Sequence, residues 1–243
     1  MKLKNRKDIS SEVGKFFQEI KKLPKVNCIR CGVSYRGHET EKFICFKCKE
    51  KIEIQIEAEN RKQSEIQYLL QISNIPIRYE DAKFKAKTEI QLKVSKYFIE
   101  NFSQKNLKES SDILLFGSIG TGKTYISCAF ALELIRKEQK HVKYVTEYEL
   151  LSFYFEKEYQ KFRNCRNSTI LILDEIGKRV LVDWQRIQLE ELLSFRYNNM
   201  LPTIYITNLE QNQFKEFLGD RLADRLRENK IQRFAFYGES LRR

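Results

Sequence analysis

The chain has 243 residues, of which 42% are hydrophobic and 32% are charged, and its formal net charge is +12. This apolar content can bury the core of one large domain, or of one domain plus a small module. The longest apolar runs, "ILLF" and "ILIL", are far too short to cross a bilayer, and the polar start "MKLKNRKDIS" has no signal-peptide pattern. We therefore expect a cytoplasmic protein with no membrane partner. The positive charge is consistent either with an ordinary solvated surface or with attraction to a polyanion.

Four cysteines near the N-terminus form two C-x2-C pairs: Cys28 with Cys31, and Cys45 with Cys48. In a reducing compartment such pairs indicate tetrahedral Zn²⁺ rather than disulfides, because both sulfurs of a pair can meet one ion. Four cysteines complete a closed, structural site, and the metal would supply folding free energy to so small a module.

Helical patterns lie on both sides of these cysteines. "SEVGKFFQEIKKL" predicts a short amphipathic helix that ends at Pro24, and the stretch rich in Glu, Gln and Lys predicts one long helix over about 49–72. Pro76 forbids helix continuation, so we place a domain boundary there. The N-terminal module then covers residues 1–75 and a second domain covers residues 76–243.

The second domain alternates short apolar runs with helical stretches. The runs are "DILLFG", "HVKYVT", "TILILDE" and "TIYITN", and helices are expected from Lys123 to about Lys137, from about Tyr148 and from about Trp184. Nearly continuous apolar strands separated by helices indicate an α/β fold with a parallel sheet covered on both faces.

The stretch "GSIGTGKT" matches the phosphate-binding loop G-x-x-x-x-G-K-[ST] between a predicted strand and a predicted helix. Its backbone N–H groups and the helix N-terminus form an anion site for ATP. Lys123 is expected to reach the β- and γ-phosphates, and Thr124 is expected to contact Mg²⁺. The nucleotide-binding residues predicted here are Gly117, Ser118, Gly120, Thr121, Gly122, Lys123 and Thr124.

Two acidic residues, Asp174 and Glu175, follow the apolar run of "TILILDE". Asp174 is expected to order the metal shell with Thr124, and Glu175 to polarise the attacking water as general base. The alternative is that the pair only caps the next helix.

Polar groups beyond these acids are candidates for sensing the γ-phosphate. Asn208 ends the run "TIYITN", where it could touch that phosphate or could simply begin a turn. Arg221 and Arg225 share one face of the next helical stretch. One of them could reach a neighbouring subunit's phosphate, or both could be solvated.

Taken together, these blocks resemble the bacterial replicative helicase loaders of DnaC type and their relatives, the IstB-type ATPases of transposons, both in the AAA+ superfamily. The resemblance runs from about Ile75 to Arg242 and includes "IPIRYEDAKF", "ILDEIG", "SFRYNNMLPTIYITN", "LGDRLADRLRE" and "YGESLRR". It implies an AAA+ core with a reduced or absent lid. It also implies Asn208 as sensor, Arg225 as the trans-acting finger and Arg242 as a residue that faces nucleotide.

The resemblance also implies contact with single-stranded DNA. Trp184 falls where the DnaC type has an aromatic residue that lies against DNA, and Lys178 and Arg179 place positive charge beside it, as unpaired bases and their phosphates require. A second candidate is the aromatic and basic stretch 153–163, although core packing explains Phe153 and Phe162 equally well. Val182 departs from the family pattern, which can have a small polar DNA contact there.

The function that this resemblance implies is ATP-dependent loading of the replicative helicase. The N-terminal module is expected to bind the helicase hexamer, with a zinc ribbon that contacts DNA as the rival. The AAA+ domains are expected to associate side by side when ATP-bound, with weak ATPase activity stimulated by DNA or partner. The alternatives are an IstB-type transposition helper with duplex DNA and a transposase, and a nucleotide-gated adaptor with negligible turnover. The cysteine module argues against the first and Glu175 against the second.

Overall fold

The computed structural model describes residues 18–19, 21–36, 44–102 and 111–241. Its contacts divide the chain into two units, Met1–Gln63 and Ser64–Arg243. The helix expected over residues 11–23 lies largely outside the described residues. Within the described part of the chain, no helix combines the length and the apolar character needed to cross a membrane.

The first unit contains a small hairpin in which β1 (Lys25–Asn27) pairs antiparallel with β2 (Ser34–Arg36). Cys28 and Cys31 lie in the loop between these strands, where the N–H of Gly32 donates to the carbonyl of Cys28 at 2.8 Å. This turn brings the first C-x2-C pair together at one end of the hairpin.

A long helix, α2 (Phe46–Ile72), follows the hairpin and confirms the helix expected over about 49–72. Ile66 and Leu69, near its C-terminal end, are buried in the core of the second unit. The division between the units therefore falls inside α2, whereas Pro76 follows the end of that helix and precedes the short 3-10 helix η1 (Ile77–Tyr79).

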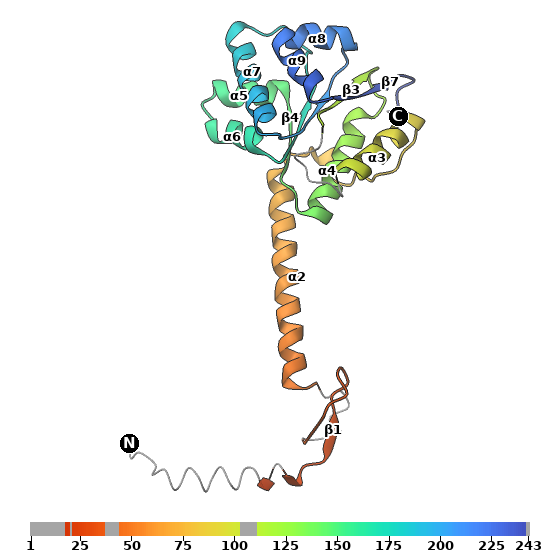
Figure 1. Ribbon diagram of the computed structural model, residues 1–243, viewed down its shortest axis with the longest axis vertical. Coiled ribbons are helices and arrows are strands. Elements are labelled where there is room, and N and C mark those ends of the chain that lie inside the picture. Colours follow the sequence, from red (N-terminus) through yellow and green to blue (C-terminus); the bar gives the residue numbers. More distant parts are fainter. Residues whose placement is uncertain (1–17, 20, 37–43, 103–110, 242–243) are drawn as a thin grey trace, which may run out of the picture. The chain divides into compact units, whose positions relative to one another are not determined.

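The second unit is built on a five-stranded sheet in the order β4-β5-β6-β3-β7, with every neighbouring pair parallel (Figure 1). The strands are β3 (Ile113–Gly117), β4 (Val142–Thr146), β5 (Ile170–Asp174), β6 (Thr203–Ile206) and β7 (Gln232–Phe236). The parallel sheet predicted from the apolar runs is confirmed. The edge strand β7 was not expected, because its sequence "QRFAF" begins with two polar residues and offers only a three-residue apolar run.

Helices cover both faces of this sheet because its strands are apolar on both sides. In β3, Ile113 and Leu115 belong to one core cluster, and Leu114 and Phe116 belong to the other. The first face is covered by α3 (Glu89–Phe102) and α4 (Lys123–Glu138). The second is covered by α5 (Glu147–Phe155), α6 (Tyr159–Asn167), α7 (Asp183–Asn198), α8 (Gln211–Leu218) and α9 (Asp220–Glu228).

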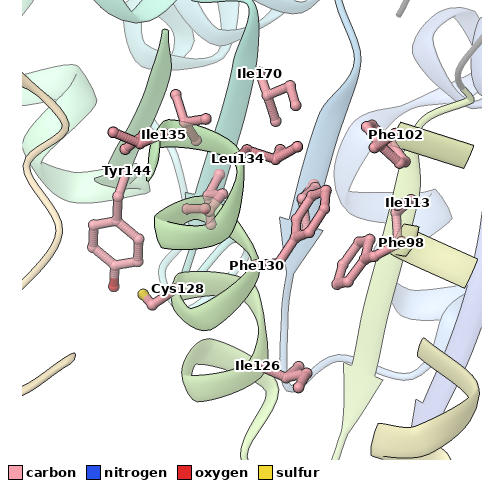
Figure 2. Close-up of a cluster of buried hydrophobic side chains, with 14 of the residues drawn as sticks. Phe98, Phe102, Ile113, Ile126, Cys128, Phe130, Leu134, Ile135, Tyr144 and Ile170 are labelled. Carbon is pink, nitrogen blue, oxygen red and sulfur yellow. The ribbon is translucent and has the colours of Figure 1, made fainter. Parts of the chain in front are cut away.

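Aromatic packing fixes α4 on the first face (Figure 2). The rings of Phe98 from α3 and Phe130 from α4 stack with centroids 4.0 Å apart and an angle of 4° between their planes. Phe102 adds an edge-on contact to Phe130 at 5.4 Å. Each buried phenylalanine contributes roughly 1.5–3 kcal/mol. The helix that begins at the phosphate loop is therefore anchored by α3, an element that the sequence analysis did not identify.

Candidate nucleotide-binding site

The predicted site residues gather at one edge of the sheet in a cleft of about 780 Å³. Parallel strands end at the same edge, so loops far apart in sequence meet there. The lining residues include Pro76, Arg78, Tyr79, Lys87, Gln91, Gly120, Thr121, Gly122, Lys123, Thr124, Tyr144, Asp174, Glu175, Lys178, Thr207, Asn208 and Leu241.

The phosphate loop connects β3 to α4 and is held by its neighbours. Gly117 has φ of 111°, and a Cβ there would lie 2.5 Å from the carbonyl oxygen of Phe236 in β7. The N–H of Ser118 donates to that same oxygen at 2.8 Å. At Gly122, with φ of 91°, a Cβ would overlap the side-chain amide of Gln91. Only glycine fits such a backbone at so close an approach, so β7 and α3 both determine the shape of the loop.

Lys123 lies inside this loop. Its Nζ donates to the carbonyl oxygens of Gly117 and Ser118, both at 2.7 Å, and its side chain is buried. The ammonium group is therefore placed next to the backbone that would surround a phosphate, where its charge can neutralise that anion.

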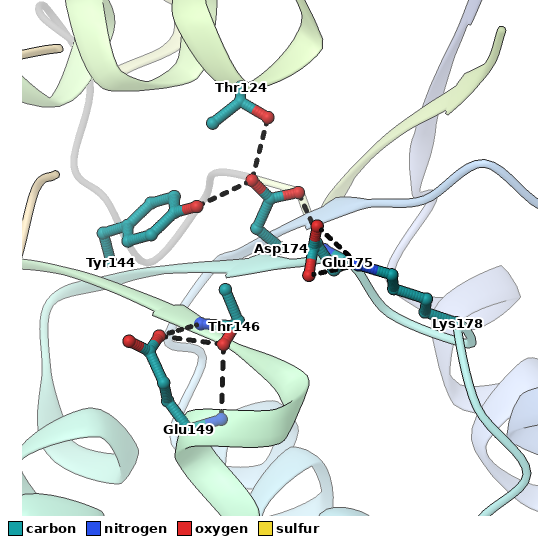
Figure 3. Close-up of polar contacts among 7 residues, drawn as sticks. All are labelled: Thr124, Tyr144, Thr146, Glu149, Asp174, Glu175 and Lys178. Atoms are coloured by element: carbon teal, nitrogen blue, oxygen red, sulfur yellow. Dashed lines mark hydrogen bonds and ion pairs between the residues drawn. The ribbon is translucent and has the colours of Figure 1, made fainter. Parts of the chain in front are cut away.

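Asp174, at the end of β5, is a buried carboxylate with three hydrogen-bond donors (Figure 3). Its Oδ2 accepts from the hydroxyls of Thr124 and Tyr144, each at 2.8 Å, and its Oδ1 accepts from the N–H of Glu175 at 2.7 Å. Burial raises the pKa of Asp174, and the three donors act in the opposite direction. Because a carboxylate and a hydroxyl are oxygen ligands of the kind that Mg²⁺ prefers, the Thr124–Asp174 pair fits that ion.

Glu175 lies at the rim of the cleft in the left-handed backbone region, with φ of 56°. A non-glycine residue in this region carries strain of order 1–3 kcal/mol, a feature that clusters at functional sites. Both oxygens of its carboxylate accept from Lys178 Nζ at 3.1 Å (Figure 3). The side chain is half exposed, so water can reach the carboxylate.

The two polar residues after β6 occupy different places. Thr207 is buried, and its hydroxyl donates to the carbonyl of Ile176 at 2.7 Å, which ties the loop after β6 to the loop after β5. Asn208 is exposed and lines the cleft with Glu175.

The end of the described chain also reaches the phosphate loop. The N–H of Leu241 donates to the carbonyl of Gly120 at 2.9 Å, and Leu241 lines the cleft. Arg242, the next residue, lies outside the described residues.

Arg221 and Arg225 are not among the described residues that line this cleft. The guanidinium of Arg225 contacts the hydroxyl of Ser194 and lies 5.4 Å from the ring centroid of Tyr197, both on α7. Arg221 forms an ion pair with Glu190 at 3.1 Å. Both arginines therefore lie on the α7–α9 side of the domain.

Trp184 belongs to an aromatic surface made by two helices. Its ring stacks at 6.3 Å from Tyr154 and 6.0 Å from Phe155, both on α5, and the residue is 37% exposed. The guanidinium of Arg179 lies 4.0 Å over the ring of Tyr148, also on α5. The neighbouring Lys178 forms an ion pair with Glu175. Along α5, aromatic rings thus meet Trp184 from α7 and Arg179 from the loop before α7.

The stretch 153–163 is divided between core and surface. Phe162 is buried in the core of the second face, and Phe153 packs against that core. Phe155 and Tyr159 are exposed.

In the first unit, the sulfur atoms of the four cysteines of the two C-x2-C pairs lie within 4.8 Å of one another. The Sγ atoms of Cys31 and Cys45 are 3.8 Å apart, close to the separation of about 3.8 Å that tetrahedral Zn–S bonds of about 2.3 Å require. The backbone N–H of Cys45 donates to Cys28 Sγ at 3.4 Å and helps to lower the pKa of the Cys28 thiol to about 6. This donor set fits Zn²⁺.

Tyr144 and Gln91 are among the cleft residues that the sequence analysis did not name. Tyr144 stands within the apolar run "HVKYVT" and looks like a core residue there, and Gln91 lies on the unexpected helix α3. Gln91 is buried, and its amide nitrogen donates to the carbonyl of Thr121 at 3.2 Å. Neither residue stands out in the sequence, since a tyrosine in an apolar run and a glutamine in a charged stretch are both ordinary.

Comparison with known proteins identifies the family. A family described as IstB-like ATP binding protein matches residues 30–242. The replicative helicase loader DnaC of Escherichia coli (strain K12) is 25% identical over 124 residues, which are 48% of this chain and 50% of that protein. The replicative helicase loader DnaI of Bacillus subtilis (strain 168) is 28% identical over 123 residues, which are 49% of this chain and 39% of that protein. The chain thus spans about half the length, or less, of these curated relatives.

Solved structures give the same fold. The crystal structure of the DnaC helicase loader matches with a TM-score of 0.59 and 24% identity, over 67% of this chain and 100% of that one. The crystal structure of DnaI matches with a TM-score of 0.61 and 20% identity, over 72% of this chain and 99% of that one. Since the family match covers most of the residues, the chain belongs to the family of IstB-like ATP binding proteins and carries the AAA+ fold of the DnaC-type loaders.

Proposed function

We propose that this protein is an ATP-dependent loader of the replicative DNA helicase. The observation that carries the proposal is the AAA+ cleft in which the phosphate loop, Asp174 and Glu175 meet. The similarity to the replicative helicase loaders DnaC and DnaI supports the loader role.

In the proposed ATPase reaction, each cleft residue has a task that its position suits. Lys123 would neutralise the β- and γ-phosphates, and Thr124 and Asp174 would hold Mg²⁺, which when bound would offset the phosphate charge. Glu175 accepts a proton from the attacking water. Asn208, in the loop after the neighbouring strand β6, would contact the γ-phosphate and so distinguish ATP from ADP.

The proposed side-by-side assembly is supported by the position of Arg225. Because this residue lies on the α7–α9 side and outside the cleft of its own subunit, it suits contact with the triphosphate of a neighbour. ATP can favour association only by binding the assembled form better, and an arginine supplied in trans provides that difference. Hydrolysis then weakens the assembled state.

The zinc module and the surface around Trp184 are proposed to bind the partners of this protein. The zinc module is proposed to bind the helicase hexamer, with contact to DNA as its alternative role. The surface around Trp184 and Arg179 is proposed to bind single-stranded DNA, because exposed rings beside positive charge suit stacked bases and their backbone. We propose that this occurs in the cytoplasm.

The second candidate function is that of an IstB-type transposition helper, which binds duplex DNA and a transposase. The family match favours it, because that match starts at residue 30 and so includes Cys31, Cys45 and Cys48. The cysteine module therefore does not separate the two functions, contrary to the argument from sequence. The named relatives favour the loader.

A binding experiment with the host's replicative helicase tests the proposal. The purified chain with ATP should retain the helicase hexamer on an affinity resin and should bind single-stranded in preference to duplex DNA. Lys123→Ala is the matched variant: it should lose binding of a fluorescent ATP analogue and still fold. No retention of helicase, together with ATP-dependent binding of duplex DNA, would support the transposition helper instead.

A further inference from the structure

Tyr144 is a buried polar residue of the cleft to which the proposed reaction assigns no task. It lies in the edge strand β4, is 6% exposed, and donates its hydroxyl to Asp174 Oδ2 at 2.8 Å. Figure 3 shows this hydroxyl and that of Thr124 approaching the same carboxylate oxygen from different directions.

The ring of Tyr144 is held in place on two sides. Its ring belongs to the core cluster of the first face (Figure 2). Its backbone N–H donates to the carbonyl of Ser73 at 2.7 Å, just after α2, and the neighbouring Lys143 Nζ donates to the carbonyl of Ile72 at 2.6 Å. Core packing and the end of α2 therefore fix the position from which the hydroxyl reaches Asp174.

The other donor on the same oxygen has a second task. In the proposed site, the hydroxyl of Thr124 would turn toward Mg²⁺, and Oδ2 would then keep only Tyr144 among the donors that the structure gives it. Since Oδ1 is held by the N–H of Glu175, loss of the Tyr144 hydroxyl would leave the carboxylate fixed at one oxygen only.

We infer that Tyr144 is a positioning residue for the Mg²⁺–nucleotide site, which holds the Asp174 carboxylate in the orientation that receives the ion. This inference rests on the proposed nucleotide function. Partners that orient the groups around a bound metal commonly change metal affinity by 10–100-fold when they are removed.

The test measures binding rather than turnover. A fluorescent ATP analogue is titrated in EDTA and over a series of Mg²⁺ concentrations with wild type, Tyr144→Phe and Tyr205→Phe. Tyr205 is the matched control, a buried tyrosine in β6 on the opposite face of the sheet. Tyr144→Phe should bind the analogue as wild type does in EDTA and should need about tenfold more Mg²⁺ for half-maximal tightening. Tyr205→Phe should match wild type.

A double-mutant cycle with Asp174→Asn separates positioning from general packing, and circular dichroism checks that each variant is folded. In the Asp174→Asn background, Tyr144→Phe should cause no further change in Mg²⁺ dependence, because the group that it positions is altered already. Equal Mg²⁺ dependence of wild type and Tyr144→Phe, or an unchanged effect in the Asp174→Asn background, would overturn the inference and leave the nucleotide site intact. A wild-type protein whose nucleotide binding ignores Mg²⁺ would overturn both.

Discussion

At the scale of single residues, the proposed general base carries an ion pair that affects its chemistry. Both oxygens of Glu175 accept from Lys178, whose ammonium competes for the lone pairs that an attacking water needs. The two side chains are about half exposed or more, so the pair is worth roughly 0.2–1 kcal/mol and is easily broken. A DNA phosphate that attracts Lys178 would release Glu175.

Lys178→Ala should therefore raise ATP turnover measured without DNA, by no more than about fivefold. Stimulation by single-stranded DNA should shrink in the same variant. Lys137→Ala is the matched control, since Lys137 pairs with Glu133 at 2.7 Å on the exposed side of α4, away from the cleft lining. A fall in turnover without DNA would show that Lys178 assists the reaction instead of restraining Glu175.

Trp184 is a second residue whose surroundings determine the expected effect of a substitution, here on the affinity for single-stranded DNA. Its ring is stacked with Tyr154 and Phe155, and the residue is still 37% exposed, so part of this aromatic cluster is accessible to a base. Trp184→Ala should weaken single-stranded DNA binding by roughly 1–3 kcal/mol. Fluorescence anisotropy with a labelled oligonucleotide measures this loss, and Tyr68→Ala, which removes an exposed ring from α2, should leave affinity unchanged. Equal affinities in all three proteins would remove Trp184 from the DNA surface.

At the scale of elements, the cysteine hairpin and the AAA+ sheet differ in what stabilises them. The sheet has an apolar cluster on each face. Among the described residues, the cluster at the hairpin consists of three buried cysteines, Cys28, Cys45 and Cys48, with Tyr35 and Ile44 packed against them. So small a cluster cannot offset the conformational entropy that is lost when the hairpin becomes ordered. The free energy of zinc binding can offset this loss.

Removal of zinc should therefore unfold the hairpin and spare the nucleotide site. Cys48→Ser, or chelation, should remove zinc measured by mass spectrometry and should abolish hydrogen-exchange protection in β1 and β2. Binding of a fluorescent ATP analogue should persist. Cys128→Ala is the control, because Cys128 is buried in α4 and should not affect zinc content. Full zinc content in Cys48→Ser would disprove the predicted ligand set.

At the scale of the whole molecule, the position of Arg225 suggests that one subunit holds only part of the reaction machinery. The cleft contains the phosphate loop and Glu175, while Arg225 lies against Ser194 and Tyr197 of α7. Completion of the site by a neighbour would link turnover to assembly.

Arg225→Ala should bind ATP normally, and its ATP turnover should fall at least about tenfold. The variant should also no longer associate in the presence of ATP, as measured by ultracentrifugation. Mixing it with Lys123→Ala should restore part of the turnover, because the intact cleft of one variant then meets the intact Arg225 of the other. Arg227→Ala, which breaks an exposed pair with Asp224 on the same helix, is the control and should behave as wild type. No recovery in the mixture would argue against an arginine supplied in trans.

The sequence by itself determined the features that depend on contiguous residues. The motif "GSIGTGKT" can be recognised from its local glycines and the helix that follows, and the spacing within the two C-x2-C pairs is typical of a metal site. Strands such as "ILLFG" and "ILILD" could be predicted because burial on both faces of a sheet requires continuous apolar residues.

Tertiary structure alone decided which distant residues complete these features. β7 was not predicted, since an edge strand has one free side and tolerates polar residues, yet its Phe236 carbonyl shapes the phosphate loop at Gly117. Tyr144 and Gln91 are indistinguishable from core and surface residues in the sequence, and they become part of the cleft because strand order brings Tyr144 next to Asp174 and helix packing brings Gln91 next to Thr121. Their roles depend on contacts between residues far apart in the chain, which no local pattern encodes.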